Sequence, residues 1–141
     1  IAKLGQSSGE IGYTEPHEAK LFVEETGVDA LAVAIGSAHG FYKDEPKLDI
    51  PRLARISNET GAMLVLHGAS GISGNVLRQA IRNGICKINL ATEIKNIFMQ
   101  TLRSRLKGEN EIDLRKIFPS ATDAVANLVQ HKMQTIRLKE G

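Results

Sequence analysis

The chain has 141 residues, of which 42% are hydrophobic and 24% charged, and its net charge is +2 at pH 7. This length suits one domain with a buried core, and these fractions are ordinary for a globular protein. The small net charge and the 4% of aromatic residues argue against a nucleic-acid-binding surface. The longest apolar run, residues 30–35, is too short to span a bilayer. The single cysteine, Cys86, excludes an internal disulfide framework and indicates a reducing compartment, so we expect a cytoplasmic location.

Short β-rich runs alternate with stretches of helical periodicity, which predicts βα units around a parallel sheet. The first predicted helix is capped by the hydroxyl of Thr14 and ends at Gly27. A strand over residues 30–35 follows, and because it shows no polar alternation we expect it to be buried on both faces. The next helix is capped by Asp49 and closed by Gly61.

The middle of the chain repeats this pattern. A strand over residues 63–66 precedes a helix over 75–83, and a further strand covers 85–90. Alternation in this last strand predicts two sets of side chains on opposite faces: Ile85, Lys87 and Asn89 on one, and Cys86, Ile88 and Leu90 on the other. We expect the apolar set, Cys86 included, to pack against helices, and Lys87 and Asn89 to point into a barrel or cleft.

Two longer helices complete the pattern. The first is capped by Thr92 and extends to about Leu106, and the second runs from about Ser120 to Leu138. We expect the second helix to bury four apolar side chains: Val125, Leu128, Val129 and Met133.

The predicted strands, with a further one at residues 1–4, make four βα units. Four such units are half of an eightfold TIM barrel, which typically needs about 250 residues. Half a barrel has open sheet edges that something must cover. We therefore expect an α/β fold in which residues 1–141 form half of one barrel domain, with the other half preceding Ile1.

Two histidines stand where predicted strands end and small-residue loops begin. His39 follows the strand at 30–35, and His67 follows the strand at 63–66. The carboxyl ends of parallel strands face one site, and a catalytic zinc takes three protein ligands plus an open position. A single histidine of this kind is more often a hydrogen-bonded structural residue. Two in matching positions, each followed by glycine, favour a metal pair whose third ligand comes from elsewhere.

The other two histidines, His17 and His131, lie within predicted helices. We expect both to be exposed, and we assign neither a role.

Two segments beside the histidines have the composition of phosphate cradles. Residues 68–71, Gly-Ala-Ser-Gly, offer clustered backbone N–H groups and a hydroxyl just before a helix. Residues 89–92, Asn-Leu-Ala-Thr, end at the start of another helix. Residues 68–71 alone are better explained as an ordinary βα turn that uses glycine for its conformational freedom. Two on adjacent strands match the phosphate site formed after strands seven and eight of many barrels.

Lys87 leaves two interpretations open. An inward-facing lysine on a barrel strand is how Schiff-base aldolases work, whereas a structural lysine would pair with a buried carboxylate from outside this sequence. The two histidines favour the structural role, because a metal would already supply the electrophile.

Taken together, these residues resemble the class II, metal-dependent ketose-bisphosphate aldolases. The likeness runs from Pro16 to about Met133 and is densest in four segments: residues 27–40, 46–49, 66–70 and 87–93. The resemblance implies an eightfold barrel, of which this chain is the C-terminal half with strands five to eight. It implies cleavage of a ketose 1,6-bisphosphate into dihydroxyacetone phosphate and glyceraldehyde 3-phosphate.

The resemblance also implies roles for individual residues. His39 and His67 would bind Zn²⁺, and Asn89 would contact the enediolate. The triose phosphate would be held by eight residues: Gly40, Gly68, Ala69, Ser70, Asn89, Leu90, Ala91 and Thr92. A monovalent cation near the phosphate and a homo-oligomer, dimer or tetramer, are implied as well, with no nucleic-acid or membrane partner.

The chain departs from the family's pattern at several places. The third zinc histidine and the proton-transferring aspartate belong to the N-terminal half and have no counterpart here. The loop before Pro16 is cut short, as if there were a gap near residues 6–7, so Glu10 is not matched to the family's loop glutamate. Pro119 stands where many relatives carry an arginine for the distal phosphate, which leaves Arg115 as the candidate. Ala91 is closer to the tagatose type, although fructose and tagatose bisphosphate both stay open.

Three hypotheses follow. The leading one is the C-terminal half of a zinc aldolase, inactive as an isolated chain. The second is a non-catalytic module or partner subunit that binds a phosphorylated ligand, and the third is a lysine-based aldolase that uses Lys87.

Overall fold

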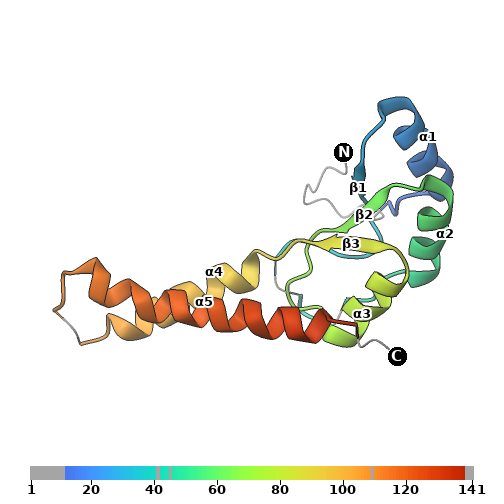
Figure 1. The fold of residues 1–141 in the computed structure, drawn as a ribbon. Helices are drawn as coiled ribbons and strands as arrows, with labels where there is room; N and C mark the ends of the chain where they lie inside the picture. Colours follow the sequence, from blue (N-terminus) through green and yellow to red (C-terminus); the bar gives the residue numbers. More distant parts are fainter. Residues whose placement is uncertain (1–11, 41, 45, 109, 139–141) are drawn as a thin grey trace. The chain divides into compact units, whose positions relative to one another are not determined.

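The computed structural model describes residues 12–40, 42–44, 46–108 and 110–138 (Figure 1). The chain divides between Asn89 and Leu90 into two compact units. The first unit holds six elements in this order: α1 (Pro16–Thr26), β1 (Ala30–Ala32), α2 (Ile50–Thr60), β2 (Met63–Leu66), α3 (Gly74–Arg82) and β3 (Ile85–Ile88). The second holds α4 (Thr92–Arg105) and α5 (Leu114–Ile136). The strand expected at residues 1–4 and the gap expected near 6–7 lie outside the described residues.

The three strands form one parallel sheet in chain order, β1-β2-β3, with α2 and α3 as the connections between them. In the register, Ala30 lies opposite Met63, and Leu64 lies opposite Ile85. The predicted α/β class and parallel βα units are therefore confirmed. Because the strands are parallel, the loops that follow β1, β2 and β3 start from the same edge of the sheet.

The helix boundaries that depend on local signals agree with the sequence, with one exception. Gly27 and Gly61 end α1 and α2 in the left-handed conformation, and the Asp49 side chain caps α2 by accepting from the Arg52 N–H. Thr14, however, does not cap α1, whose N-cap is Glu15. The Thr14 hydroxyl instead accepts from the backbone N–H of Ala34 at 2.8 Å, so it ties the start of α1 to the segment after β1.

The expectation that residues 30–35 are buried on both faces is wrong. Ala30 and Ala32 are exposed, whereas Val33 and Ile35, beyond the end of β1, are buried. The core lies on the side of the sheet that carries α2 and α3, and it contains Leu53, Ile56, Leu64, Leu77, Ala80 and Ile85. The opposite face carries Ala30, Ala32 and Met63, which are exposed, together with Val65, which is buried. The lack of alternating polar residues in this segment therefore does not mean that both faces of the strand are buried.

The face assignment for the third strand is wrong for Ile85 and Cys86, because β3 carries an irregularity at Cys86, whereas Lys87 and Ile88 lie on the faces that were expected. Leu64 lies opposite Ile85, but Val65 lies opposite Lys87, so Cys86 is an extra residue between two paired ones. Such a bulge breaks the alternation. Ile85 therefore shares the buried face with Leu64, and Lys87 lies on the other face, where it is exposed. Cys86 is exposed rather than packed among helices.

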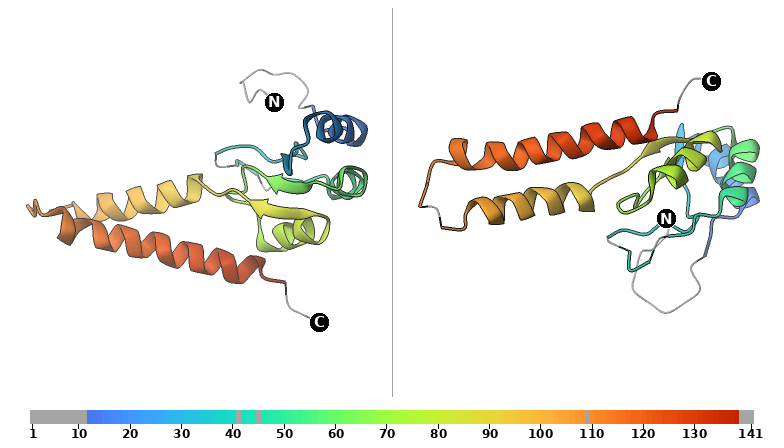
Figure 2. Two further views of the ribbon diagram at one scale, coloured as in Figure 1. Left: turned by 45° about the horizontal axis from the view of Figure 1, so that its top comes forward. Right: turned by 90° about the horizontal axis from the view of Figure 1, so that it is seen from below.

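In the second unit, α4 and α5 lie side by side, as both views of Figure 2 show. The Phe98 and Phe118 rings meet edge to face with centroids 6.1 Å apart. A half-buried ion pair joins Lys132 on α5 to Glu93 on α4, with the nitrogen 2.7 Å from Oε2. These contacts fix the register of the two helices.

The predicted ends of this pair need correction. Thr92 is the first residue of α4, and Ala91 occupies the cap position. The final helix begins at Leu114, not near Ser120, and continues through Pro119. The Asp113 side chain caps this helix by accepting a hydrogen bond from the Arg115 N–H. The cap stabilises the first turn, although a proline inside a helix is normally unfavourable.

The predicted buried stripe of the last helix is wrong, since Val125 and Leu128 are only half-buried and Val129 and Met133 are exposed. Val129 and Met133 are 37% and 65% exposed, and the buried residues of α5 are Ile117 and Ala121 near its start. In the part of the chain that the structure describes, no helix combines the length and apolar character that crossing a membrane requires.

Candidate functional site

The two predicted metal ligands lie next to each other. His39 follows β1 and His67 follows β2, and their ring centroids are 5.7 Å apart with the planes at 76°. Both side chains are exposed. Two imidazoles that share one ion at the zinc–nitrogen length of about 2.1 Å place their centroids roughly 5–6 Å apart. The observed pair therefore fits two ligands of one metal ion.

The pair has no third ligand within the described residues. No group of three or more His, Cys, Asp or Glu side chains with the geometry of a metal site is found among them. A catalytic zinc usually has three protein ligands. The described part of this chain thus supplies at most two of them at this place.

Asn89 connects this pair to Lys87. The ammonium Nζ of Lys87 lies 2.6 Å from Oδ1 of Asn89, and Nδ2 of Asn89 lies 3.2 Å from Nε2 of His67. Because an ammonium group only donates, the amide oxygen faces Lys87 and the amide nitrogen faces His67. The amide N–H therefore donates to Nε2 of His67, which assigns the proton of the neutral ring to Nδ1.

The backbone of Asn89 is also held at this edge of the sheet. Its N–H donates to the Leu66 carbonyl at 2.9 Å, and its own carbonyl accepts from the Ala69 N–H at 3.3 Å. These bonds continue the pairing of β2 and β3 past the ends of the strands. As expected, Lys87 lies beside Asn89; its expected carboxylate partner from outside this sequence stays a prediction.

The first predicted phosphate cradle is a compact buried turn. Ala69 and Ser70 are 0% and 2% exposed, and Gly68 and Gly71 have φ values of +65° and +86°. A Cβ at Gly68 would collide with the carbonyl oxygen of Ala38, so only glycine allows the loop after β2 to approach the loop after β1 this closely. Gly40, with φ +108°, directly follows His39 in the loop after β1.

The second predicted cradle is divided between the two units. Asn89 ends the first unit, and Leu90, Ala91 and Thr92 begin the second, where Thr92 opens α4. Each unit is defined by itself, so a phosphate role for Leu90, Ala91 and Thr92 stays a prediction.

Tyr42 is a further residue of this site, and the sequence reasoning missed it. Its hydroxyl lies 2.6 Å from the backbone nitrogen of Ala38 and 2.8 Å from the carbonyl oxygen of Gly68. It thus contacts the loops that carry both histidines. The available signal was weak: Tyr42 is one of two tyrosines in the chain and comes three residues after His39.

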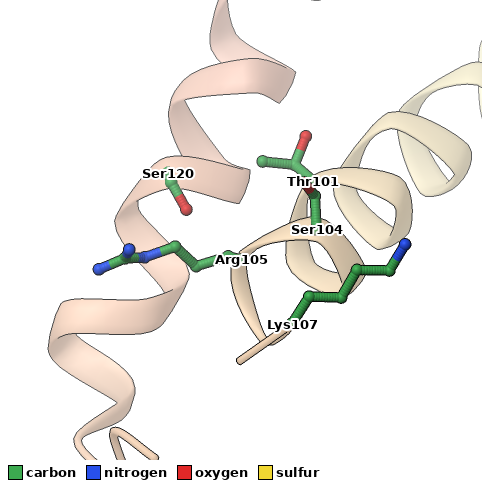
Figure 3. A pocket seen from close by; sticks show the side chains of 5 residues that line it. All are labelled: Thr101, Ser104, Arg105, Lys107 and Ser120. Carbon is green, nitrogen blue, oxygen red and sulfur yellow. The ribbon is translucent and has the colours of Figure 1, made fainter. Parts of the chain in front are cut away.

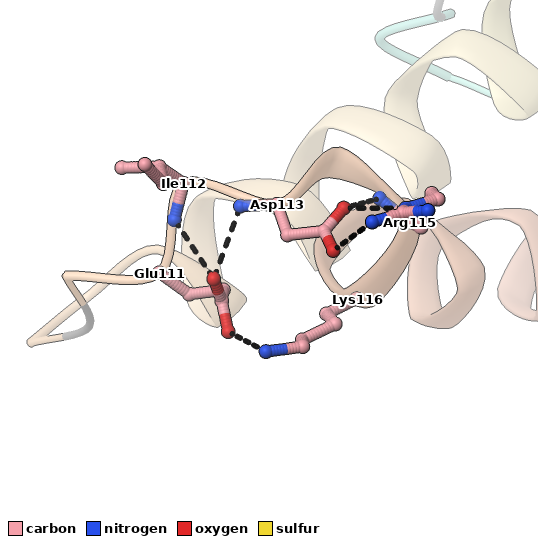
Figure 4. A network of polar contacts seen from close by, with 5 residues as sticks. All are labelled: Glu111, Ile112, Asp113, Arg115 and Lys116. Atoms are coloured by element: carbon pink, nitrogen blue, oxygen red, sulfur yellow. Dashed lines mark hydrogen bonds and ion pairs between the residues drawn. The ribbon is translucent and has the colours of Figure 1, made fainter.

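The candidate for the distal phosphate, Arg115, is engaged in a local network (Figure 4). Its guanidinium donates to the carboxylate of Asp113 at 2.9 Å, although 90% of the arginine side chain is exposed. These hydrogen bonds lower the pKa of Asp113. The Lys116 ammonium, 2.8 Å from Glu111, and the backbone N–H of Asp113 likewise lower the pKa of Glu111. The network shapes the turn before α5, and a phosphate role for Arg115 stays a prediction.

The second unit has a hollow of about 390 Å³ between α4 and α5 (Figure 3). Its lining is polar and contains none of the predicted site residues: Thr101, Ser104, Arg105, Lys107 and Ser120. His17 and His131 are exposed, as expected.

The family model described as fructose-bisphosphate aldolase class-II matches residues 2–140. Among solved structures, the YdjI aldolase from Escherichia coli K12 is 37% identical, with a TM-score of 0.78 over 88% of this chain and 46% of that one. A putative fructose-1,6-bisphosphate aldolase from Coccidioides immitis is 30% identical, with a TM-score of 0.81 over 90% of this chain and 44% of that one.

A fructose-bisphosphate aldolase from Campylobacter jejuni shares the fold at 20% identity, with a TM-score of 0.69 over 88% of this chain and 45% of that one. The chain thus spans about half the length of the solved structures that it matches.

Proposed function

Because this chain belongs to the class II fructose-bisphosphate aldolase family, we propose that it is the C-terminal half of a zinc-dependent ketose-bisphosphate aldolase. The intact enzyme would cleave fructose or tagatose 1,6-bisphosphate into dihydroxyacetone phosphate and glyceraldehyde 3-phosphate, a step of carbohydrate metabolism such as glycolysis. The single observation that carries the proposal is the pair His39 and His67, whose rings lie 5.7 Å apart beyond adjacent parallel strands.

The half-barrel part of the proposal has separate support. On one face of the three parallel strands, Ala30, Ala32 and Met63 are exposed, and parallel sheets normally have both faces covered. In a closed barrel this face would line the interior beneath the site. A complementary N-terminal half would supply the remaining strands, the third metal ligand and the group that transfers the proton.

The chemistry divides between the metal and the residues of this chain. Zinc held by His39 and His67 would polarise the substrate carbonyl and stabilise the enediolate as a Lewis acid. Asn89 would donate its amide N–H to the enediolate oxygen, and the proximity of that amide to the metal pair, 3.2 Å from Nε2 of His67, supports this role. The turn at Gly68, Ala69 and Ser70 would hold the phosphate through backbone N–H groups, together with Gly40 and with Leu90, Ala91 and Thr92 of the next unit.

Several further features complete the proposal. Lys87 would orient Asn89, since its ammonium lies 2.6 Å from the amide oxygen. It would form no covalent intermediate, because the metal would already supply the electrophile. Arg115 would bind the distal phosphate, and a monovalent cation would lie near the triose phosphate. The intact protein would be a cytoplasmic homo-oligomer, and the single cysteine is in keeping with a reducing compartment.

The test compares His39→Ala and His67→Ala with His17→Ala in the intact protein that carries this chain. His17 is an exposed histidine of α1 and serves as the matched control. Each ligand variant is expected to lose bound zinc and chelator-sensitive aldol cleavage, whereas the control keeps both. Metal content is measured by elemental analysis and cleavage by coupled detection of triose phosphate. Retention of stoichiometric zinc by both ligand variants would overturn the proposal.

A further inference from the structure

The hydroxyl of Tyr42 joins two loops that are far apart in the sequence. It accepts a hydrogen bond from the Ala38 N–H at 2.6 Å, directly before His39. It also lies 2.8 Å from the carbonyl oxygens of Ala38 and of Gly68, the residue directly after His67. A phenol has one proton to donate. The bond to Gly68 is the one that crosses from the loop after β1 to the loop after β2.

The approach of the two loops has independent support in the backbone. A Cβ at Gly68 would collide with the backbone of Ala38. The backbones of the two loops therefore touch at the point that the Tyr42 hydroxyl bridges. The tyrosine ring itself packs over the second glycine of the turn, because a Cβ at Gly71 would lie 3.4 Å from its Cδ2. Tyr42 thus contacts the turn at both ends.

We propose that Tyr42 is a positioning residue that fixes the spacing of His39 and His67. The inference rests on the proposed function, since this spacing matters when the two imidazoles share one metal ion. Both histidine rings are exposed and stand on loops, so little packing restrains them. Partners that orient metal ligands typically change metal affinity 10–100-fold when they are removed. Without the Tyr42 hydroxyl, His39 would still be present but would no longer be held at the distance that one ion requires.

The test is Tyr42→Phe in the intact protein, with Tyr13→Phe as the matched control. Tyr13 is the other tyrosine, and the centroid of its ring lies 5.4 Å from the guanidinium carbon of Arg52 on α2. Zn²⁺ and Co²⁺ affinities are measured by chelator competition, and the visible spectrum of bound Co²⁺ reports on ligand geometry. Tyr42→Phe is expected to weaken metal binding about 10–100-fold and to alter the Co²⁺ spectrum, whereas Tyr13→Phe changes neither.

A second pair of variants separates loop spacing from backbone strain. Gly68→Ala and Gly27→Ala place an alanine at the same φ of +65°, but only Gly68 has a neighbour that the new methyl group would hit. Gly68→Ala is therefore expected to weaken metal binding beyond any change caused by Gly27→Ala.

Hydrogen exchange of the Ala38 amide in the metal-free protein tests the tether without any metal. Tyr42→Phe is expected to accelerate this exchange, because the amide loses its acceptor. Unchanged exchange together with unchanged metal affinity would overturn the positioning role of Tyr42. A wild-type protein that binds no metal would instead overturn the proposed function, and the exchange result would still decide whether Tyr42 joins the loops.

Discussion

Asn89 donates its amide N–H to His67, with Nδ2 3.2 Å from Nε2. An ion that binds Nε2 must displace this bond, and an ion that binds Nδ1 moves the ring proton to Nε2, which then no longer accepts. Metal binding and this hydrogen bond therefore exclude each other. Binding of a metal ion at His67 would therefore leave the Asn89 amide N–H free to donate to a ligand.

Asn89→Ala is accordingly expected to affect metal affinity and turnover differently in the intact protein. Metal affinity should stay the same or rise by up to about fivefold, since one hydrogen bond is worth about 1 kcal/mol. The turnover number should fall roughly 10²–10³-fold, the usual cost of losing one donor to a developing oxyanion. Chelator competition and steady-state kinetics measure the two effects. Asn58→Ala, an exposed position on α2, is the control, and weaker metal binding in Asn89→Ala would contradict the exclusion argument.

Lys87→Met tests whether this lysine is structural. The ammonium donates to Asn89 at 2.6 Å. In the intact protein the barrel interior would shield this bond from water, and a shielded hydrogen bond from a charged group contributes about 1.5–3 kcal/mol. The variant is expected to lower the free energy of unfolding of the intact protein by that order, and Lys87→Arg should recover part of it. Denaturant unfolding measures the loss, and borohydride should trap no substrate adduct on Lys87. A variant with native stability and metal content but no turnover would show that the structural role is wrong.

Local signals predicted much of this fold, and long-range contacts account for the errors. Gly27 and Gly61 end helices because their backbones enter the left-handed region, which depends on glycine itself. The bulge at Cys86 depends on how β3 pairs with β2, and one strand's alternation does not contain that information. The same holds for the site. The sequence predicted that His39 and His67 meet, but Tyr42 acts on Gly68, 26 positions away, through a single hydroxyl.

The cap of α2 gives a prediction about acid stability. Backbone and side-chain hydrogen bonds from Arg52 lower the pKa of Asp49 in the folded chain. The folded state therefore binds this proton less readily than the unfolded state. The stabilisation is present above the ordinary aspartate pKa of about 4, and it is lost as the pH falls through the lower, folded value.

Asp49→Asn keeps an oxygen for the Arg52 N–H but removes the charge. The difference in Tm between wild type and variant should be largest near neutral pH and should shrink below about pH 4. Thermal unfolding from pH 7 to pH 3 measures it. Asp123→Asn, at an exposed position on α5, should leave Tm close to wild type throughout. A constant gap for Asp49→Asn would mean that lost packing, and not charge, is responsible.

The isolated chain of 141 residues gives the broadest test. It is expected not to cleave ketose bisphosphates at a useful rate, because the described residues offer two proposed metal ligands at the site and no third. The proton-transferring group would also be missing, and such a group typically contributes about 10²–10⁴-fold to the rate. Co-expression with the proposed N-terminal half should restore cleavage that EDTA abolishes, since the ligand set is then complete. Cleavage is measured for the chain alone and for the combined halves, each with and without EDTA. Rapid, EDTA-resistant cleavage by the chain alone would contradict both the zinc mechanism and the half-barrel, because neither could then be needed for the reaction.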